Sequence, residues 1–141
     1  MDTFPDIKLK NGYFSANESI ILCRGMKRKN LHSMDQDWEA WIKYEEEVIA
    51  YKTSFKRKKL RIIVICFFEK DDGPIKYWDF GPENCMDGFQ SKPEGKYTRR
   101  LRRWFLDEFG IVLPQAGPWG EIDACHDPHN QTTSVFCAYQ Y

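Results

Sequence analysis

The segment from Cys125 to His129 combines side chains that could bind a metal or exchange protons. It supplies a thiol, two imidazoles and a carboxylate, which are ligand types that zinc accepts. No second group in the sequence supplies the remaining ligands at the usual spacing, and Asp-Pro and His-Asn are common turn pairs. We therefore predict a turn without metal or cofactor. A small enzyme that uses His126 and His129 as acid and base remains an alternative.

Two carboxylates just upstream, Glu121 and Asp123, alternate along a predicted strand and so share one face of it. They could form an acid–base pair, but solvent exposure or pairing with arginines is the simpler interpretation. Cysteine catalysis would need one activated thiol in a cleft, and nothing marks one of the five cysteines for it. The motifs of serine hydrolases, P-loop proteins, dinucleotide-binding proteins and zinc proteases are absent from the sequence. We predict that the chain is not an enzyme.

The charges of the chain are balanced in number but separated along the sequence. There are 21 basic and 21 acidic residues, yet the segment from Trp104 to Tyr141 has five acidic residues and no Lys or Arg. A sign asymmetry of this kind indicates either internal pairing or a charged partner.

A second charge pattern opposes the dipole of the helix predicted from Lys96 to Phe109. Basic residues crowd its first half, and acidic residues lie near its end, although the dipole favours the reverse. Three of the arginines project away from the apolar stripe: Arg99, Arg100 and Arg103. They form either a solvated face paired with the acidic C-terminal part or a surface for phosphates or an acidic protein. With the basic segment 56–61, the segment 96–103 supports a nucleic-acid-associated module as an alternative function.

The run from Ile62 to Phe68 is the strongest secondary-structure signal. It is apolar without interruption and rich in β-branched residues, which predicts a central strand covered on both faces. The turn sequence Asp71 to Pro74 follows, and Ile75 to Phe80 is its predicted hairpin partner.

The remaining elements follow from capping, spacing and turn residues. Ser33 and Gln36 form a capping-box pattern, which predicts a helix up to about Lys52; the alternative is two strands, Trp38 to Tyr44 and Val48 to Thr53. We also predict a loosely structured arm over residues 1–17, with a short strand near Tyr13-Phe14 as its one regular element. Further strands are predicted at Ser19–Arg24, Trp119–Cys125 and Ser134–Tyr139. The connecting segments are a basic loop at Gly25–His32, a loop at Gly81–Lys92 and a link at Ile111–Pro118, and the second helix is predicted to end at Gly110.

These elements predict one α+β domain over residues 1–141, in which two helices pack on a mostly antiparallel sheet in the order β-α-β-β-α-β-β. That arrangement leaves one sheet face bare, so the N-terminal arm or a homodimer is expected to cover it. We expect no secretory signal, no membrane span and no disulfide, and a cytoplasmic location.

A small, aromatic-rich α+β domain with segregated charge and no catalytic motif resembles the immunity proteins of bacterial toxin systems, including contact-dependent growth inhibition. The resemblance implies a protein that binds one cognate toxin and neutralises it without catalysis. It carries over no binding residues. From the charge pattern we predict an acidic toxin-binding set, with the alternative face Arg99, Arg100 and Arg103; the acidic set is Asp35, Asp37, Glu46, Glu47, Asp71 and Asp72.

Overall fold

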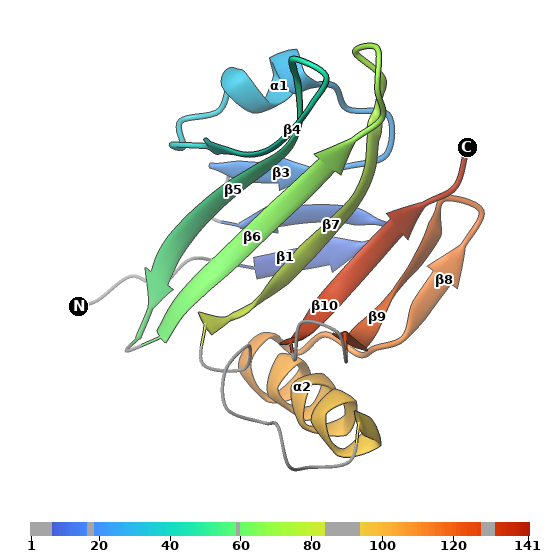
Figure 1. The fold of residues 1–141 in the computed structure, drawn as a ribbon. Coiled ribbons are helices and arrows are strands. Elements are labelled where there is room, and N and C mark those ends of the chain that lie inside the picture. Colours follow the sequence, from blue (N-terminus) through green and yellow to red (C-terminus); the bar gives the residue numbers. More distant parts are fainter. Residues whose placement is uncertain (1–6, 17–18, 59, 84–93, 128–131) are drawn as a thin grey trace.

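The computed structural model describes residues 7–16, 19–58, 60–83, 94–127 and 132–141 of the chain. Its main element is a seven-stranded antiparallel sheet in the order β4-β5-β6-β7-β10-β9-β8 (Figure 1). The bounds are β4 Glu39–Tyr44, β5 Glu47–Arg57, β6 Leu60–Phe68, β7 Ile75–Pro82, β8 Gln115–Gly117, β9 Gly120–Asp127 and β10 Thr132–Tyr139.

The predicted apolar strand is confirmed as β6, an inner strand next to the middle of the sheet, but only one of its faces is fully buried. Along β6, Ile62, Val64, Cys66 and Phe68 are buried, whereas the alternate residues Ile63, Ile65 and Phe67 are half-buried. The prediction of two covered faces is therefore wrong, because an unbroken apolar run does not reveal how completely each face is covered. The middle strand of the sheet is its predicted hairpin partner, β7.

A second sheet covers the inner face of the first, in a segment that was expected to have little structure. It contains β1 (Ile7–Lys10), β2 (Tyr13–Ala16) and β3 (Ile20–Leu22), and lies behind the large sheet in Figure 1. Phe14 is fully buried, with its ring centroid 4.9 Å from that of Trp78 on β7. The prediction of a loosely structured arm is therefore wrong for residues 7–16, because the few apolar residues there pack on the large sheet.

The prediction of a long helix that begins at Ser33 is wrong, and the alternative prediction of two strands is correct. The segment forms the β4–β5 hairpin, whose turn residues Glu45 and Glu46 have φ of 47° and 75°. Aromatic and β-branched residues favour this conformation. A short helix, α1 (Arg28–His32), lies instead in the predicted basic loop. The α+β class holds and the short strand near Tyr13-Phe14 is confirmed as β2, although β1 and β8 were not predicted and the element order differs.

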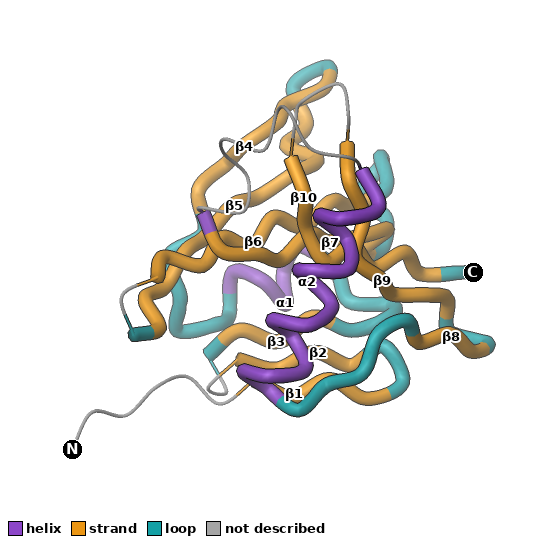
Figure 2. The backbone as a smooth tube through the Cα atoms, turned by 90° about the horizontal axis from the view of Figure 1, so that it is seen from below, coloured by secondary structure: helices purple, strands orange, loops and turns teal. Residues whose placement is uncertain are grey.

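The second predicted helix is confirmed as α2 (Glu94–Phe109), and Gly110 follows it with φ of 69°. Its buried side chains include Tyr97, Leu101 and Phe105; the Phe105 ring lies 5.6 Å from that of Phe80 on β7. The helix crosses the end of the sheet (Figure 2). The predicted C-terminal hairpin is confirmed as β9 and β10. Most of the predicted loop Gly81–Lys92 lies outside the described residues.

None of the four described cysteines takes part in a disulfide. Burial raises the pKa of Cys66 and of Cys137 to about 12, which keeps both thiols protonated and unreactive near neutral pH. Among the described segments, no helix is long and apolar enough to cross a membrane.

Candidate functional site

Strand β4 lies at one edge of the large sheet and is exposed along its whole length. It carries three large apolar side chains in the open: Trp41 is 48% exposed, Ile42 39% and Tyr44 44%. Its pairing with β5 is irregular around Trp41 and Ile42. Such bulges redirect side chains and are frequent at binding sites, and edge strands offer unpaired backbone groups.

Two lysines hold the aromatic rings of this edge in place. The Nζ atom of Lys52 lies 4.2 Å from the centroid of the Trp41 ring, and that of Lys70 lies 4.0 Å from the Tyr44 ring. Cation–π contacts of this kind favour one ring orientation while leaving much of the ring surface open. The edge therefore presents positioned aromatic groups to solvent.

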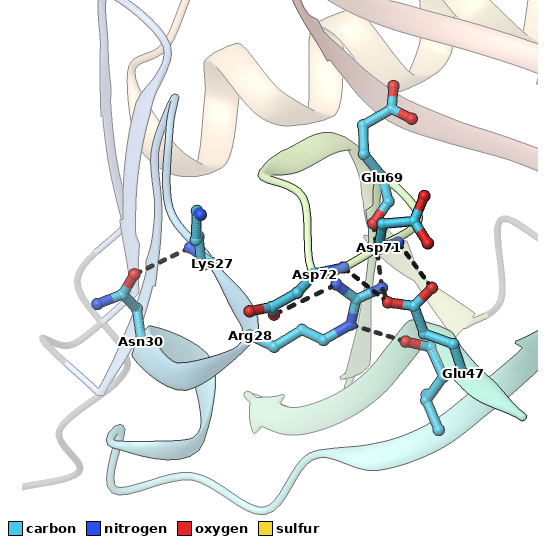
Figure 3. A network of polar contacts seen from close by, with 8 residues as sticks. Lys27, Arg28, Asn30, Glu47, Glu69, Asp71 and Asp72 are labelled. Atoms are coloured by element: carbon cyan, nitrogen blue, oxygen red, sulfur yellow. Dashed lines mark hydrogen bonds and ion pairs between the residues drawn. The ribbon is translucent and has the colours of Figure 1, made fainter.

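Acidic turns adjoin the end of β4. The β4–β5 turn contains Glu45 and Glu46, and the β6–β7 turn contains Asp71 and Asp72. The carboxylate of Glu47 joins the two turns, because it accepts the backbone N–H of Asp71 at 2.9 Å and that of Asp72 at 2.8 Å (Figure 3).

Arg28 of α1 fixes this pair of turns from the side. Its Nε donates to the carbonyl of Val48 at 2.8 Å, and its Nη2 donates to that of Glu69 at 3.2 Å. The guanidinium also lies 3.3 Å from the carboxylate of Glu47 and 3.8 Å from that of Asp72 (Figure 3). Bonds to several partners hold a planar guanidinium firmly. Helix α1 and the two turns therefore behave as one unit.

The structure brings together four of the six predicted acidic residues: Glu46, Glu47, Asp71 and Asp72. The other two, Asp35 and Asp37, lie on the loop before β4. Because Glu39 pairs with Lys52 and Tyr44 pairs with Glu47, this loop lies at the end of β4 opposite to the turns. The five-residue rise from Glu39 to Tyr44 separates them by about 17 Å. Asp35 and Asp37 line a hollow there with Trp38 and Thr53. Carboxylates thus lie at both ends of β4.

The hydrogen bonds to the Glu47 carboxylate predict a lowered pKa for this group, which can be tested by titration. Backbone N–H groups of Asp72 and Asp71, and then the Arg28 charge, lower the pKa of Glu47. A carboxyl group whose pKa is lower in the folded state stabilises that state above its unfolded pKa, and loses this effect as pH falls through the folded value. We expect the side-chain carboxyl carbon of Glu47, followed by NMR, to titrate below the pKa of an ordinary glutamate. Loss of this signal in Glu47→Gln identifies it, and a Glu47 signal that titrates at or above the ordinary value would contradict the hydrogen bonds to the turn.

The alternative basic face lies on α2, far along the chain from β4. Arg99, Arg100 and Arg103 are exposed, and Arg103 pairs with Asp107 at 3.1 Å. Arg102 binds Asp123 of the C-terminal hairpin through two hydrogen bonds, of 2.9 and 2.7 Å. Internal pairing of the helix with the acidic hairpin is therefore confirmed for Arg102.

The residues considered for catalysis have structural partners. Nδ1 of His126 lies 2.8 Å from Oγ1 of Thr133, and its ring stacks on Tyr97 of α2 with centroids 5.1 Å apart. Burial raises the pKa of Asp123, but hydrogen bonds from Arg102 and from the N–H of Ala124 outweigh it, so the pKa lies below the ordinary value. His129 lies outside the described residues. Within the described part, no group of three metal-ligating side chains is placed to hold an ion.

Sequence reasoning missed the apolar members of the site. Trp41 and Ile42 lay within the helix predicted from Ser33, whereas strand β4 exposes both. The composition of Trp38 to Tyr44 was the available signal, because aromatic residues there favour a strand.

An exposed aromatic edge strand that is bracketed by carboxylates is typical of a protein-binding surface. The model of the RhsI1 immunity protein family matches residues 5–141, and the chain belongs to this family. A solved structure described as "Rhs1-CT in complex with cognate immunity protein RhsI1" is 34% identical, with a TM-score of 0.83, and the match covers 95% of this chain and 87% of that one. No curated protein matches.

The resemblance to toxin immunity proteins is therefore confirmed for the class. The family within that class is RhsI1, and the match does not extend to the contact-dependent growth inhibition type.

Proposed function

We propose that this protein binds a cognate toxin of the Rhs1-CT kind and neutralises it without turnover, through a surface that we call the acidic edge. The acidic edge consists of β4 and the turns Glu45–Glu46 and Asp71–Asp72. The observation that carries the assignment is the exposure of Trp41, Ile42 and Tyr44 on one edge strand with carboxylates at both ends. The structure of a relative in complex with its toxin supports toxin binding as the function.

The two kinds of side chain have different roles in this proposal. Buried aromatic anchors supply most of the affinity in protein interfaces, so Trp41 and Tyr44 are the expected hot spots. Charges at the rim contribute mainly to the association rate and to partner choice. The carboxylates therefore select a toxin with a basic surface, such as the phosphate-binding site of a nuclease. Neutralisation is proposed to occur in the cytoplasm, where free thiols persist.

Charge reversal on the two faces tests which of them binds the toxin. Glu45→Lys with Glu46→Lys and Asp71→Asn should slow association by about tenfold or more at low salt, and the difference should shrink at high salt. Glu47 is left intact because it holds the turns. Toxin association is measured by surface plasmon resonance, and protection by growth of cells that express the toxin. Melting temperatures should change little.

The matched control is Arg99→Glu with Arg103→Glu on α2, which should leave association and protection unchanged. If the α2 variant abolishes protection while the acidic-edge variant retains it, the toxin binds the basic face. RNA binding by the purified chain at physiological salt, with no effect of either variant on toxin binding, would support the nucleic-acid alternative.

A further inference from the structure

The outer face of the large sheet, on the side away from β1–β3 (Figure 1), carries an apolar row that begins at the exposed edge strand. Ile42 of β4 lies opposite Ala50 of β5, which lies opposite Phe67 of β6. Phe67 lies opposite Tyr77 of β7, and Tyr77 lies opposite Ala138 of β10. Side chains of directly opposite residues share one face of a sheet. The row therefore crosses five neighbouring strands without a charged residue.

The aromatic rings of this face contact one another and are only partly covered. The ring centroid of Tyr77 lies 4.7 Å from that of Phe67 and 5.2 Å from that of Phe136 on β10. All three side chains are half-buried. We call this surface the outer row, and it consists of Ile42, Ala50, Phe67, Tyr77, Phe136 and Ala138.

The inner face of the same strands already has its cover, whereas the outer row has the composition of a contact surface. Phe14 of β2 packs on Trp78, and Phe105 of α2 packs on Phe80. A sheet that is packed on one side normally alternates apolar residues inward with polar residues outward. An apolar patch on the other side marks an interaction surface.

The area of the β4 edge indicates that a toxin would also have to contact a neighbouring surface. Strand β4 has six residues, so its edge is about 20 Å long and, with its side chains, about 10 Å thick, or about 200 Å². A specific protein interface buries about 800 Å² on each partner. The outer face from β4 to β10 adds about 19 Å by 20 Å, or about 400 Å². Edge and outer face together approach the area that a stable complex needs.

We propose that the toxin docks face-on, covering the outer row together with the acidic edge, and does not add a strand to β4. This inference rests on the toxin-binding function proposed above. The two surfaces are continuous, because Ile42 opens the row and the Trp41 ring lies against Lys52, the partner of Ile65 on the outer face. The acidic turns adjoin the same end of the row, since Ile42 precedes Glu45 by three positions.

The irregular pairing of β4 favours face-on docking over strand addition. Its register with β5 shifts on both sides of Ile42. Such a bulge interrupts the regular line of backbone groups that an added strand would need, and bulges are one means by which edge strands avoid pairing. Contacts to the face use side chains, which the bulge does not disturb. The expected toxin surface is apolar where it meets the outer row and basic where it meets the turns.

Substitutions on the outer row test this docking mode. Phe67→Thr and Tyr77→Thr remove the rings and introduce a β-branched side chain that strands accept. Each should weaken binding of the purified Rhs1-CT-type toxin domain about tenfold or more in isothermal titration calorimetry. Leu106→Ala on α2 is the control, because its side chain is 43% exposed and lies away from the outer row. Its affinity for the toxin should be unchanged.

A cross-linking measurement covers the case in which a threonine variant does not fold. The photoreactive residue p-benzoylphenylalanine in place of Tyr77 keeps an aromatic ring on the outer row, and irradiation should cross-link the chain to the toxin. The same residue in place of Leu106 should give no cross-link. Melting curves verify that each variant is folded.

The outcomes separate this inference from the function on which it rests. Unchanged toxin affinity in folded Phe67→Thr and Tyr77→Thr would overturn face-on docking, and toxin binding as the function would stand. If either threonine variant does not fold, absence of a cross-link from position 77 would overturn face-on docking in the same way. Failure of the unaltered chain to bind the toxin would instead overturn the proposed function, and the inference with it.

Discussion

Replacement of Trp41 and Tyr44 by alanine is expected to weaken toxin binding about 100-fold or more, and to change the melting temperature little. Both side chains are nearly half exposed in the free protein, so their removal costs the fold little packing. In a complex they become buried, and loss of interface hot spots costs about 2 kcal/mol or more each. An effect of about 2.7 kcal/mol already corresponds to 100-fold in the dissociation constant. Isothermal titration calorimetry with the purified toxin domain measures this change.

Tyr13→Ala and Val112→Ala provide controls of matched exposure. These side chains are 49% and 63% exposed, and they lie on β2 and on the segment after α2. Toxin affinity should be unchanged in both variants. If the variants at Trp41 and Tyr44 bind the toxin with the same affinity as the two controls, the aromatic edge does not anchor the toxin.

Val64→Asp is expected to prevent folding. Val64 is fully buried in the middle of β6, opposite Phe80 of β7 and Thr53 of β5. An unpaired carboxylate there costs several kcal/mol or more, which is comparable to the ~5–15 kcal/mol stability of a whole domain. Far-ultraviolet circular dichroism and urea titration of the purified variant measure the result.

The neighbouring residue gives the control, because Ile63 faces the outer side of the same strand and is half-buried. Ile63→Asp should remain folded with a reduced free energy of unfolding. If Val64→Asp unfolds cooperatively with nearly unchanged stability, the inner face of β6 is not the core. If both variants fail to fold, the two faces of β6 are equally essential.

The elements that could be predicted from the sequence are those with strong local signals. The β6–β7 hairpin has a turn of charged residues and Gly73 between two apolar runs, and α2 ends at a glycine with positive φ. In these cases the local preference agrees with the final fold, as is typical of well-folded sequences.

The helix predicted from Ser33 failed because its capping signal serves another purpose. The hydroxyl of Ser33 donates to the carbonyl of Asn30 at 2.8 Å, so it ends α1 and does not begin a helix. The side chain of Gln36 donates to Oγ1 of Thr53 on β5 at 2.6 Å. The first bond belongs to the short helix α1, which lies in a segment predicted to be a loop, and the second joins segments whose relative position only the tertiary structure determines.

Only the acidic members of the candidate site could be predicted from the sequence. Glu46, Glu47, Asp71 and Asp72 could be selected because groups of carboxylates are visible in the sequence whichever element carries them. Trp41 could not, because its exposure depends on whether its segment is helix or strand. The contact of Arg28 with both turns joins segments about 20 and 41 residues away, which no local pattern reveals.

Amide hydrogen exchange of the protein with and without its toxin tests the central claim most directly. Edge strands exchange readily when free, so toxin contact should produce a clear change there. Toxin binding should slow exchange in Glu39–Tyr44 and in the turns Glu45–Glu46 and Asp71–Asp72, with α2 unchanged. Protection that is confined to α2, with unchanged exchange in β4, would contradict the acidic edge as the toxin-binding surface.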